Sequence, residues 1–122
     1  MKQTESLKKN KDFQTVYHNG TSYANRYLVM YVLRNEDEHM KNRLGISVSK
    51  KVGNSVVRHR VTRLIRESYR LNEMLFAGGL DVVIIGRPSV KGKSFHDVEG
   101  SIMHLAGKHH ILVKSNDEEI SY

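Results

Sequence analysis

The sequence predicts a domain that mixes helices and strands, in the order helix, strand, strand, helix, strand, helix, with the strands in one mixed sheet. Residues 21–34 and 80–87 are rich in apolar, β-branched and aromatic residues, which is typical of strands. Residues 55–71 repeat apolar side chains at helical spacing. A strand at 43–49 precedes that helix, and this order favours a parallel crossover unit. With 122 residues, the chain is expected to form a single domain, residues 1–122.

The N-terminal part predicts one short helix. Residues 1–9 are polar and are expected to be loose. Asn10 is a candidate N-cap, and Asn19 and Gly20 mark the end of the helix. The apolar edge of this helix consists of Phe13, Val16 and Tyr17, which are spaced by three and four residues.

Residues 21–34 predict a strand whose two faces are both apolar. One face consists of Tyr27, Val29, Tyr31 and Leu33, and the other of Leu28, Met30 and Val32. Both faces are therefore expected to be at least partly covered. The polar segment 35–42 joins this strand to the one at 43–49, in which Leu44, Ile46 and Val48 face inward. Sequential strands with a short polar link favour an antiparallel pair.

The positive charge of the chain is concentrated in one segment. Residues 41–70 hold nine of the 20 Lys and Arg residues and a single acidic residue, Glu67, so the segment carries a charge of +8. The other 92 residues sum to −1, and the net charge of +7 is therefore a local feature.

The helix in this segment has an apolar side and a basic side. Asn54 or Ser55 is expected to cap its first turn. At about 100° per residue, the apolar side consists of Val57, Val61, Leu64, Ile65 and Leu71. The opposite side carries His59, Arg63, Arg66 and Arg70, flanked by Arg58 and Arg60. A solvated basic face is one interpretation, but such faces usually mix charge signs. Repeated Arg favours binding of a polyanion, with nucleic acid first and an anionic membrane surface second.

A turn, a strand and a helix complete the predicted elements. The turn into the basic helix consists of Lys50, Lys51, Gly53 and Asn54, which are suited to hold an anion at a helix N-terminus. Residues 80–87 form a nearly continuous apolar run, as in a strand covered on both faces. Ser94 is expected to cap a last helix at 95–107, whose apolar face consists of Val98, Ile102 and Leu105. The acidic tail at 114–122 is expected to be flexible.

The sequence gives little support for a catalytic or metal site built by the protein alone. The chain has no Cys, which excludes thiolate ligands and fits a cytoplasmic location. No apolar run approaches the ~20 residues of a membrane span, and the first residues lack the apolar stretch of a signal peptide. His104, His109 and His110 cluster in the sequence without an acid to orient an imidazole, so scattered surface histidines are expected. No serine of the basic segment has a base held by a third group.

Three aromatic residues, Phe13, Tyr17 and Tyr31, have two possible roles. Aromatic side chains on a helix and a strand usually belong to the core. They can instead line an open groove in which unpaired bases stack, worth roughly 1–3 kcal/mol per base. The residues themselves leave both roles open.

The segment RLGISVSKKVGNSVVRHRVTRLIRE (43–67) closely resembles the signature region of the bacterial ribonuclease P protein family, in which Arg-Asn-Arg and further basic residues lie on one helix. Residues 10–32 and 81–88 resemble the family's N-terminal region and its last strand, so the resemblance spans about residues 8–107. It implies an α+β sandwich of order α-β-β-β-α-β-α, with a four-stranded mixed sheet and a left-handed βαβ crossover, which is rare. Residues 21–34 are then two strands, and the fold is like that of the second domain of a small-subunit ribosomal protein.

The resemblance also implies a function. Members of the family join a large catalytic RNA, and the particle removes the 5′ leader from precursor tRNA by endonucleolytic cleavage. The RNA with its Mg²⁺ ions carries the chemistry, so no catalytic or metal-binding side chain and no obligate protein partner are expected. By position, the residues expected to face the catalytic RNA are Lys50, Lys51, Asn54, Arg58, His59, Arg60 and Arg63. Those expected in the leader-binding cleft are Phe13, Tyr17, Tyr31 and Arg66, which favours the groove over the core.

The chain departs from the family's pattern at two positions. The family usually has Asn at position 59 and a basic residue at position 62, where this chain has His59 and Thr62. His59 can still donate a hydrogen bond, but Thr62 lacks a charge beside Arg66, so leader contact is expected to be weaker or to be taken over by another residue. Asn25 and Arg26 match an Ala-Asn-Arg step of the family, with no role assigned.

Two rival functions stay open at this point. One is an RNA-binding or ribosomal-type protein that acts without a catalytic RNA. The other is a self-sufficient metal-dependent nuclease, which the scarcity of carboxylates in the basic segment disfavours.

Overall fold

The computed structural model describes residues 4–113, so the tail predicted to be flexible lies outside the described residues. In this range the protein has three α-helices and one five-stranded mixed sheet. The helices are α1 (Asn10–Asn19), α2 (Ser55–Asn72) and α3 (Phe95–Lys108), and the short 3-10 helices are η1 (Glu73–Leu75) and η2 (Pro88–Val90). The strands are β1 (Glu5–Ser6), β2 (Thr21–Ala24), β3 (Leu28–Arg34), β4 (Arg43–Val48) and β5 (Leu80–Gly86). No helix within this range is long and apolar enough to cross a membrane.

The sheet has the strand order β1-β4-β5-β3-β2. β5 pairs parallel with β4 and antiparallel with β3, and β2 pairs antiparallel with β3. The antiparallel pair expected between 21–34 and 43–49 is therefore wrong, because β5 lies between those segments. The reason is burial: nearly every residue of β5 is buried, and a strand that is apolar on both faces is best covered at the centre of a sheet.

The parallel crossover expected through the basic helix is confirmed, since β4 and β5 are parallel neighbours joined through α2. The expectation of two strands in 21–34 is also confirmed, with residues 25–27 forming the turn between β2 and β3. The sheet has five strands instead of the expected four, because Glu5–Ser6 adds a short parallel edge strand beside β4. The left-handed sense of the crossover stays a prediction.

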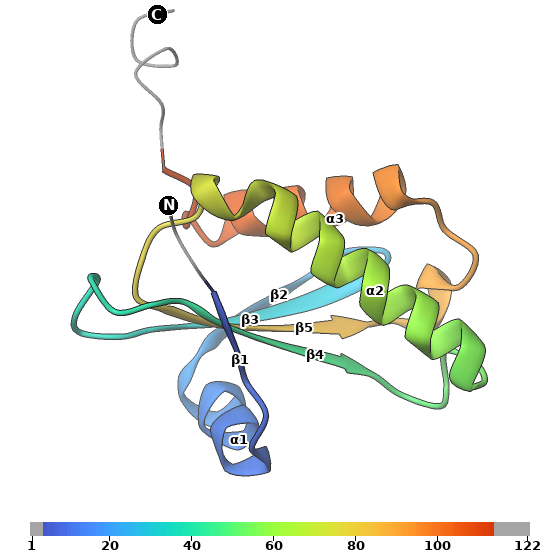
Figure 1. Ribbon diagram of the computed structural model, residues 1–122, viewed down its shortest axis with the longest axis horizontal. Helices are drawn as coiled ribbons and strands as arrows, with labels where there is room; N and C mark the ends of the chain where they lie inside the picture. Colours follow the sequence, from blue (N-terminus) through green and yellow to red (C-terminus); the bar gives the residue numbers. More distant parts are fainter. Residues whose placement is uncertain (1–3, 114–122) are drawn as a thin grey trace, which may run out of the picture.

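The helices lie on both faces of the sheet, as Figure 1 shows: α2 and α3 cover one face, and α1 packs against the other. The larger core lies under α2 and α3 and includes Leu28, Met30 and Val32 of β3. The smaller core lies under α1 and centres on Leu7, Val16 and Val83. The expected coverage of both faces of β3 is thus confirmed.

α2 is capped and oriented by its sequence. Asn54 is the N-cap, and its side chain accepts a hydrogen bond from the Val57 amide at 3.0 Å. Val61, Ile65 and Tyr69 are buried against the sheet, whereas Leu71 is 58% exposed, so its assignment to the packed side is wrong. Leu71 lies about 100° around the helix from the direction that Val61 and Ile65 share, which turns it to solvent.

The N-terminal expectations need two corrections. Asn10 is the first residue of α1 and not its N-cap, because Lys9 occupies the cap position without a side-chain hydrogen bond. The segment before α1 is not simply loose, since it forms β1 and buries Leu7. At the other end of the chain, Ser94 caps α3 as expected, in a capping box with Asp97.

Candidate nucleic-acid interface

The basic side of α2 faces away from the sheet because the opposite side is packed on β4, β5 and α3. His59, Arg60, Arg63 and Arg66 are exposed, and Arg58 is half-buried. The buried Nε of Arg58 has no hydrogen-bond partner among the described residues. Packing on the sheet and α3 therefore holds the helix in place, while its other side presents several cationic groups to solvent.

Most of these guanidinium groups are not neutralised by the protein itself. Arg70 is ion-paired with Glu67 at 2.8 Å, and Arg60 donates to the backbone carbonyl of Lys93 at 3.0 Å. Within residues 4–113, no carboxylate oxygen lies within 4.0 Å of the guanidinium nitrogens of Arg58, Arg63 or Arg66. Like charges three and four residues apart on a helix repel one another, so binding of an anion at this surface would remove an unfavourable interaction.

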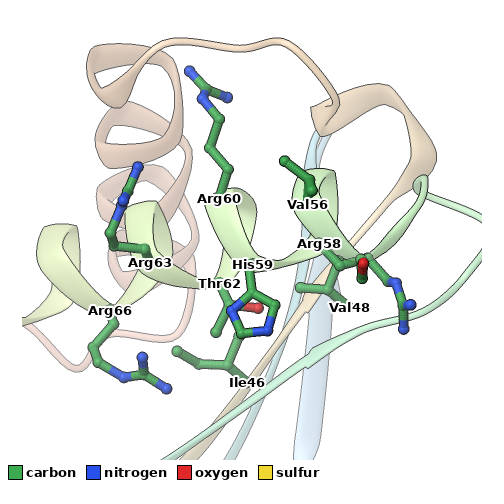
Figure 2. A pocket seen from close by; sticks show the side chains of 10 residues that line it. Ile46, Val48, Val56, Arg58, His59, Arg60, Thr62, Arg63 and Arg66 are labelled. Atoms are coloured by element: carbon green, nitrogen blue, oxygen red, sulfur yellow. The ribbon is translucent and has the colours of Figure 1, made fainter.

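The cationic side chains surround an open pocket of about 970 Å³ between α2 and β4. Its lining residues are Ile46, Val48, Ser55, Val56, Arg58, His59, Arg60, Thr62, Arg63 and Arg66. Figure 2 shows the side chains of Arg60 and Arg63 leaving α2 on the side opposite to that of Arg66. The arrangement gives a broad concave surface with a small apolar floor and several separate cationic groups, which suits an extended polyanion.

The turn before α2 lies next to this pocket. Lys50 and Lys51 are exposed there, beside the first turn of the helix. The Oδ1 atom of Asn54 is already occupied as the N-cap acceptor, so Asn54 shapes the turn through that contact. The two lysines and the helix N-terminus place positive charge at one end of the pocket.

The three predicted aromatic residues lie together where α1 packs on the other face of the sheet, with Phe13 and Tyr17 on α1 and Tyr31 on β3. The ring centroids of Tyr17 and Tyr31 are 5.0 Å apart, and those of Phe13 and Tyr17 are 6.3 Å apart. All three are partly buried against the smaller core, so each has a packed part and an exposed part. A Cβ atom at Gly45 would lie 2.6 Å from the Phe13 ring, which shows how closely that ring covers β4.

A strip of sheet borders these aromatic rings. Strand register places Val29, Ile85 and Ser47 side by side in one row, adjacent to the row that contains Tyr31. The residues of this strip are all partly exposed. Burial raises the pKa of Tyr17, and a hydrogen bond with the Ser47 side chain opposes that rise. We call the three rings and this strip the aromatic groove.

The structure separates Arg66 from the aromatic groove, although both were expected in one cleft. Arg66 lies on the α2 side of the sheet, beside Ile46. The two regions are divided by β4, whose pairing with β1 stops at Leu44. Beyond Leu44, the outer edge of β4 has no further strand partner within residues 4–113. An extended ligand that contacts both the aromatic groove and Arg66 has to pass around this edge.

The structure adds one neighbour to the basic site that the sequence analysis did not include. Arg60 reaches the backbone of Lys93, in the loop between β5 and α3. Residues 86–96 contain three cations and no acid, which is the signal that could have found this segment.

The histidines do not form a metal site in the described part of the chain. No group of three His, Asp or Glu side chains there is placed to hold a metal ion. The expectation of surface histidines is wrong for His109, which is 7% exposed and donates through Nε2 to the Met30 carbonyl at 2.8 Å. Burial lowers the pKa of His109 and so favours the neutral ring, whereas the hydrogen bond to the Met30 carbonyl opposes that shift.

Comparison of the sequence with a family model and with known proteins points to one family. A family model described as Ribonuclease P matches residues 1–110. The ribonuclease P protein component of Lachnoclostridium phytofermentans is 56% identical over 115 residues, which covers 94% of this chain and 97% of the relative. The ribonuclease P protein component of Clostridioides difficile is 47% identical over 111 residues, which covers 90% of this chain and 96% of the relative.

Solved structures agree with these relatives. The RNase P protein of Staphylococcus aureus superposes with a TM-score of 0.80 at 36% identity, over 91% of this chain and 100% of that chain. A mutant of the S. aureus protein with defective mRNA degradation activity superposes with a TM-score of 0.79 at 36% identity, over 87% of this chain and 88% of that chain. The RNase P protein of Thermotoga maritima gives a TM-score of 0.76 at 27% identity, over 91% of this chain and 99% of that chain.

Proposed function

The chain belongs to the bacterial ribonuclease P protein family and is a component of the ribonuclease P ribonucleoprotein, which processes tRNA with an RNA partner. From this premise we propose that the basic side of α2 and the turn before it bind the catalytic RNA. We further propose that the aromatic groove and Arg66 bind the 5′ leader of precursor tRNA. In this role the protein assists removal of the leader without contributing a catalytic side chain.

The observation that carries the first assignment is the set of unpaired guanidinium groups on α2. Arg58 and Arg63 have no carboxylate partner among the described residues, and phosphate oxygens of the catalytic RNA supply the negative charge that the protein does not. Lys50 and Lys51 add positive charge beside the N-terminus of α2, where the helix dipole also favours an anion. Neutralisation by RNA removes the mutual repulsion of these cations.

The leader assignment rests on the form of the aromatic groove. The partly exposed rings of Phe13, Tyr17 and Tyr31 offer faces on which unpaired bases can stack, at roughly 1–3 kcal/mol per base. An extended strand in this groove can pass around the open edge of β4 and reach Arg66 with its phosphates. Stacking is tolerant of sequence, which suits leaders that differ from one precursor tRNA to the next.

No group of three or more His, Asp or Glu side chains that could hold a metal ion comes together within residues 4–113. We propose that the Mg²⁺ ions of the reaction are bound mainly by the RNA. The contribution of the protein is electrostatic: its cations lower the repulsion between the phosphates of catalytic RNA, leader and tRNA. This screening raises substrate affinity and eases Mg²⁺ binding by the RNA.

The test is a reconstitution with three arms at low Mg²⁺ concentration. Precursor tRNA is incubated with the protein alone, with the ribonuclease P RNA of the same genome alone, and with both. Strong cleavage only in the mixture is the expected result. The protein-alone arm also receives an mRNA substrate, because a mutant of the S. aureus protein is described as defective in mRNA degradation activity.

The other results decide against the proposal. Cleavage of precursor tRNA by the protein alone identifies a self-sufficient nuclease. An RNA-alone rate that the protein does not change identifies an RNA-binding protein with no role in leader removal.

A further inference from the structure

A second group of cations lies outside α2, where the β2–β3 turn meets the loop between β5 and α3. We call this group the basic corner, and it consists of Arg26, Tyr27, Arg87, Lys91 and Lys93. Four of these five residues are cationic, and none of them forms an ion pair with a carboxylate in the described part of the chain. The two contributing segments are about 60 residues apart in the sequence.

The basic corner is organised around the ring of Tyr27. The Cζ atom of Arg26 lies 5.7 Å from the ring centroid, and the Nζ atom of Lys93 lies 5.3 Å from it. Cations at these distances are attracted to the negative face of an aromatic ring. Because the ring already has two cations close to it, its role is to hold those side chains in place and not to stack a base.

The backbone of the basic corner is fixed by hydrogen bonds. The Arg87 amide donates to the Tyr27 carbonyl at 2.9 Å, and the Arg87 guanidinium donates to the Asn25 carbonyl at 2.7 Å. The Asn25 side chain accepts from the Leu28 amide at 3.1 Å and from the Ser101 hydroxyl at 2.7 Å. These contacts give the Ala-Asn-Arg step a role in this chain, since Asn25 anchors the turn that presents Arg26.

Charges around the basic corner favour an anion. Figure 1 shows that α2 and α3 both begin at this end of the molecule, so the positive ends of two helix dipoles point there. The nearby carboxylate is Asp97, which is engaged in the capping box with Ser94. Hydrogen bonds from Ser94 are the main cause of the lowered pKa of Asp97, and the charge of Lys93 contributes less. The carboxylate of Asp97 therefore interacts mainly with the cap of α3 and only weakly with Lys93.

The other end of α3 offers an internal comparison. Lys108 lies 5.9 Å from the ring centroid of Tyr23, in the same kind of contact as that between Lys93 and Tyr27. There, however, the cations meet the negative end of the helix dipole, and Arg34 donates to the carbonyls of His109 and His110 at 2.9 and 3.2 Å. At that end Arg34 is matched by the protein's own carbonyl groups. In the basic corner only Arg87 donates to such a carbonyl, and the side chains of Arg26, Lys91 and Lys93 have no hydrogen-bond partner within residues 4–113.

We propose that the basic corner binds the phosphodiester backbone of an RNA strand and extends the RNA surface of α2 around the start of α3. Arg60 joins the two surfaces, because it lies on α2 and donates to the Lys93 carbonyl at 3.0 Å. The contact is to phosphates, so it does not depend on base sequence. This inference rests on the proposed function, since it assumes that α2 binds RNA.

The test compares two double variants that each remove two positive charges. Arg26→Ala/Lys93→Ala changes the basic corner, and Lys41→Ala/Lys108→Ala is the matched control, with exposed cations away from it. Each protein is titrated with the ribonuclease P RNA of the same genome at several KCl concentrations, after circular dichroism has verified its fold. The slope of log K against log[KCl] is expected to become shallower by roughly 1.4–1.8 for the first variant, because each lost phosphate contact accounts for about 0.7–0.9. The control is expected to keep the wild-type slope.

Three results overturn the inference, and they separate it from the proposed function. If Arg63→Ala/Arg66→Ala makes the salt slope shallower but Arg26→Ala/Lys93→Ala keeps the wild-type slope, the basic corner does not bind RNA and the proposed function stands. If Arg26→Ala/Lys93→Ala and the control Lys41→Ala/Lys108→Ala change the salt slope equally, only the net charge of the protein affects RNA binding. A wild-type slope near zero removes the proposed function together with this inference.

Discussion

Replacing Arg63 and Arg66 together by Ala tests whether the unpaired cations of α2 contact RNA phosphates. Both side chains are exposed and lack a carboxylate partner among the described residues, so their removal breaks no ion pair of the protein. Neither side chain belongs to the packed side of α2, which is held by Val61, Ile65 and Tyr69. The variant is therefore expected to fold normally and to bind RNA more weakly.

The size of the effect follows from counterion release. If the protein neutralises about five phosphates, log K for RNA falls with log[salt] at a slope of roughly −3.5 to −4.5. Without Arg63 and Arg66, about three phosphates remain neutralised, and the slope becomes roughly −2.1 to −2.7. Between about 50 and 200 mM salt, the wild type then loses roughly 100- to 500-fold in affinity, and the variant roughly 20- to 40-fold.

The assay is a fluorescence titration of the protein with a labelled complex of ribonuclease P RNA and leader-containing precursor tRNA, without Mg²⁺ and at four or more salt concentrations. Cleavage of precursor tRNA is measured separately at low Mg²⁺. Arg70→Ala is the matched control, because Arg70 lies on the same helix but is already paired with Glu67. Its slope is expected to stay near that of the wild type. If the double variant keeps the wild-type slope, or if Arg70→Ala lowers it equally, the reasoning from unpaired charge is wrong.

Three further predictions address the groove, the departure from the family and pH. Tyr31→Ala is expected to reduce the preference for precursor over mature tRNA by about 1–3 kcal/mol, since one stacking ring is lost. A loss of stability with unchanged preference would show that Tyr31 belongs only to the core. Thr62→Lys adds a cation to the pocket beside Arg66 and is expected to steepen the salt slope for leader-containing substrate by roughly 0.7–0.9; an unchanged slope would place position 62 outside the contact. Burial lowers the pKa of His109 below its ordinary 6.5, so the unfolded chain takes up this proton more readily. The free energy of unfolding is therefore expected to fall as pH drops below about 6.5, and urea titrations at about pH 7.5 and about pH 5.5 should show a smaller difference for His109→Gln than for the exposed control His96→Gln.

Features that depend on neighbouring residues could be predicted from the sequence. Asn54 and Ser94 cap their helices as expected, because the capping bond spans only three residues. The basic side of α2 follows from helical spacing in the same way. Leu71 shows the limit of this reasoning, since the projection cannot tell how far the covering sheet extends around the helix.

Features that depend on distant residues could not be predicted in the same way. The pairing of β3 with β5, and not with β4, is decided by where the most apolar strand is best buried. β1 is two residues long and has no strand pattern of its own, so it forms only because the edge of β4 is available. The basic corner joins a turn at residues 25–27 to a loop at 87–93, and no local pattern links them.

The central position of β5 has a consequence for how the chain acquires its structure during synthesis. β3 and β4 each pair with β5, a strand that is synthesised only after some 80 residues of the chain. Until then, a nascent chain carries the apolar residues Leu28, Met30 and Val32 without the strand that later pairs beside them. Long-range pairing of this kind delays folding, so the newly made protein passes through a stage in which chaperones have a substrate.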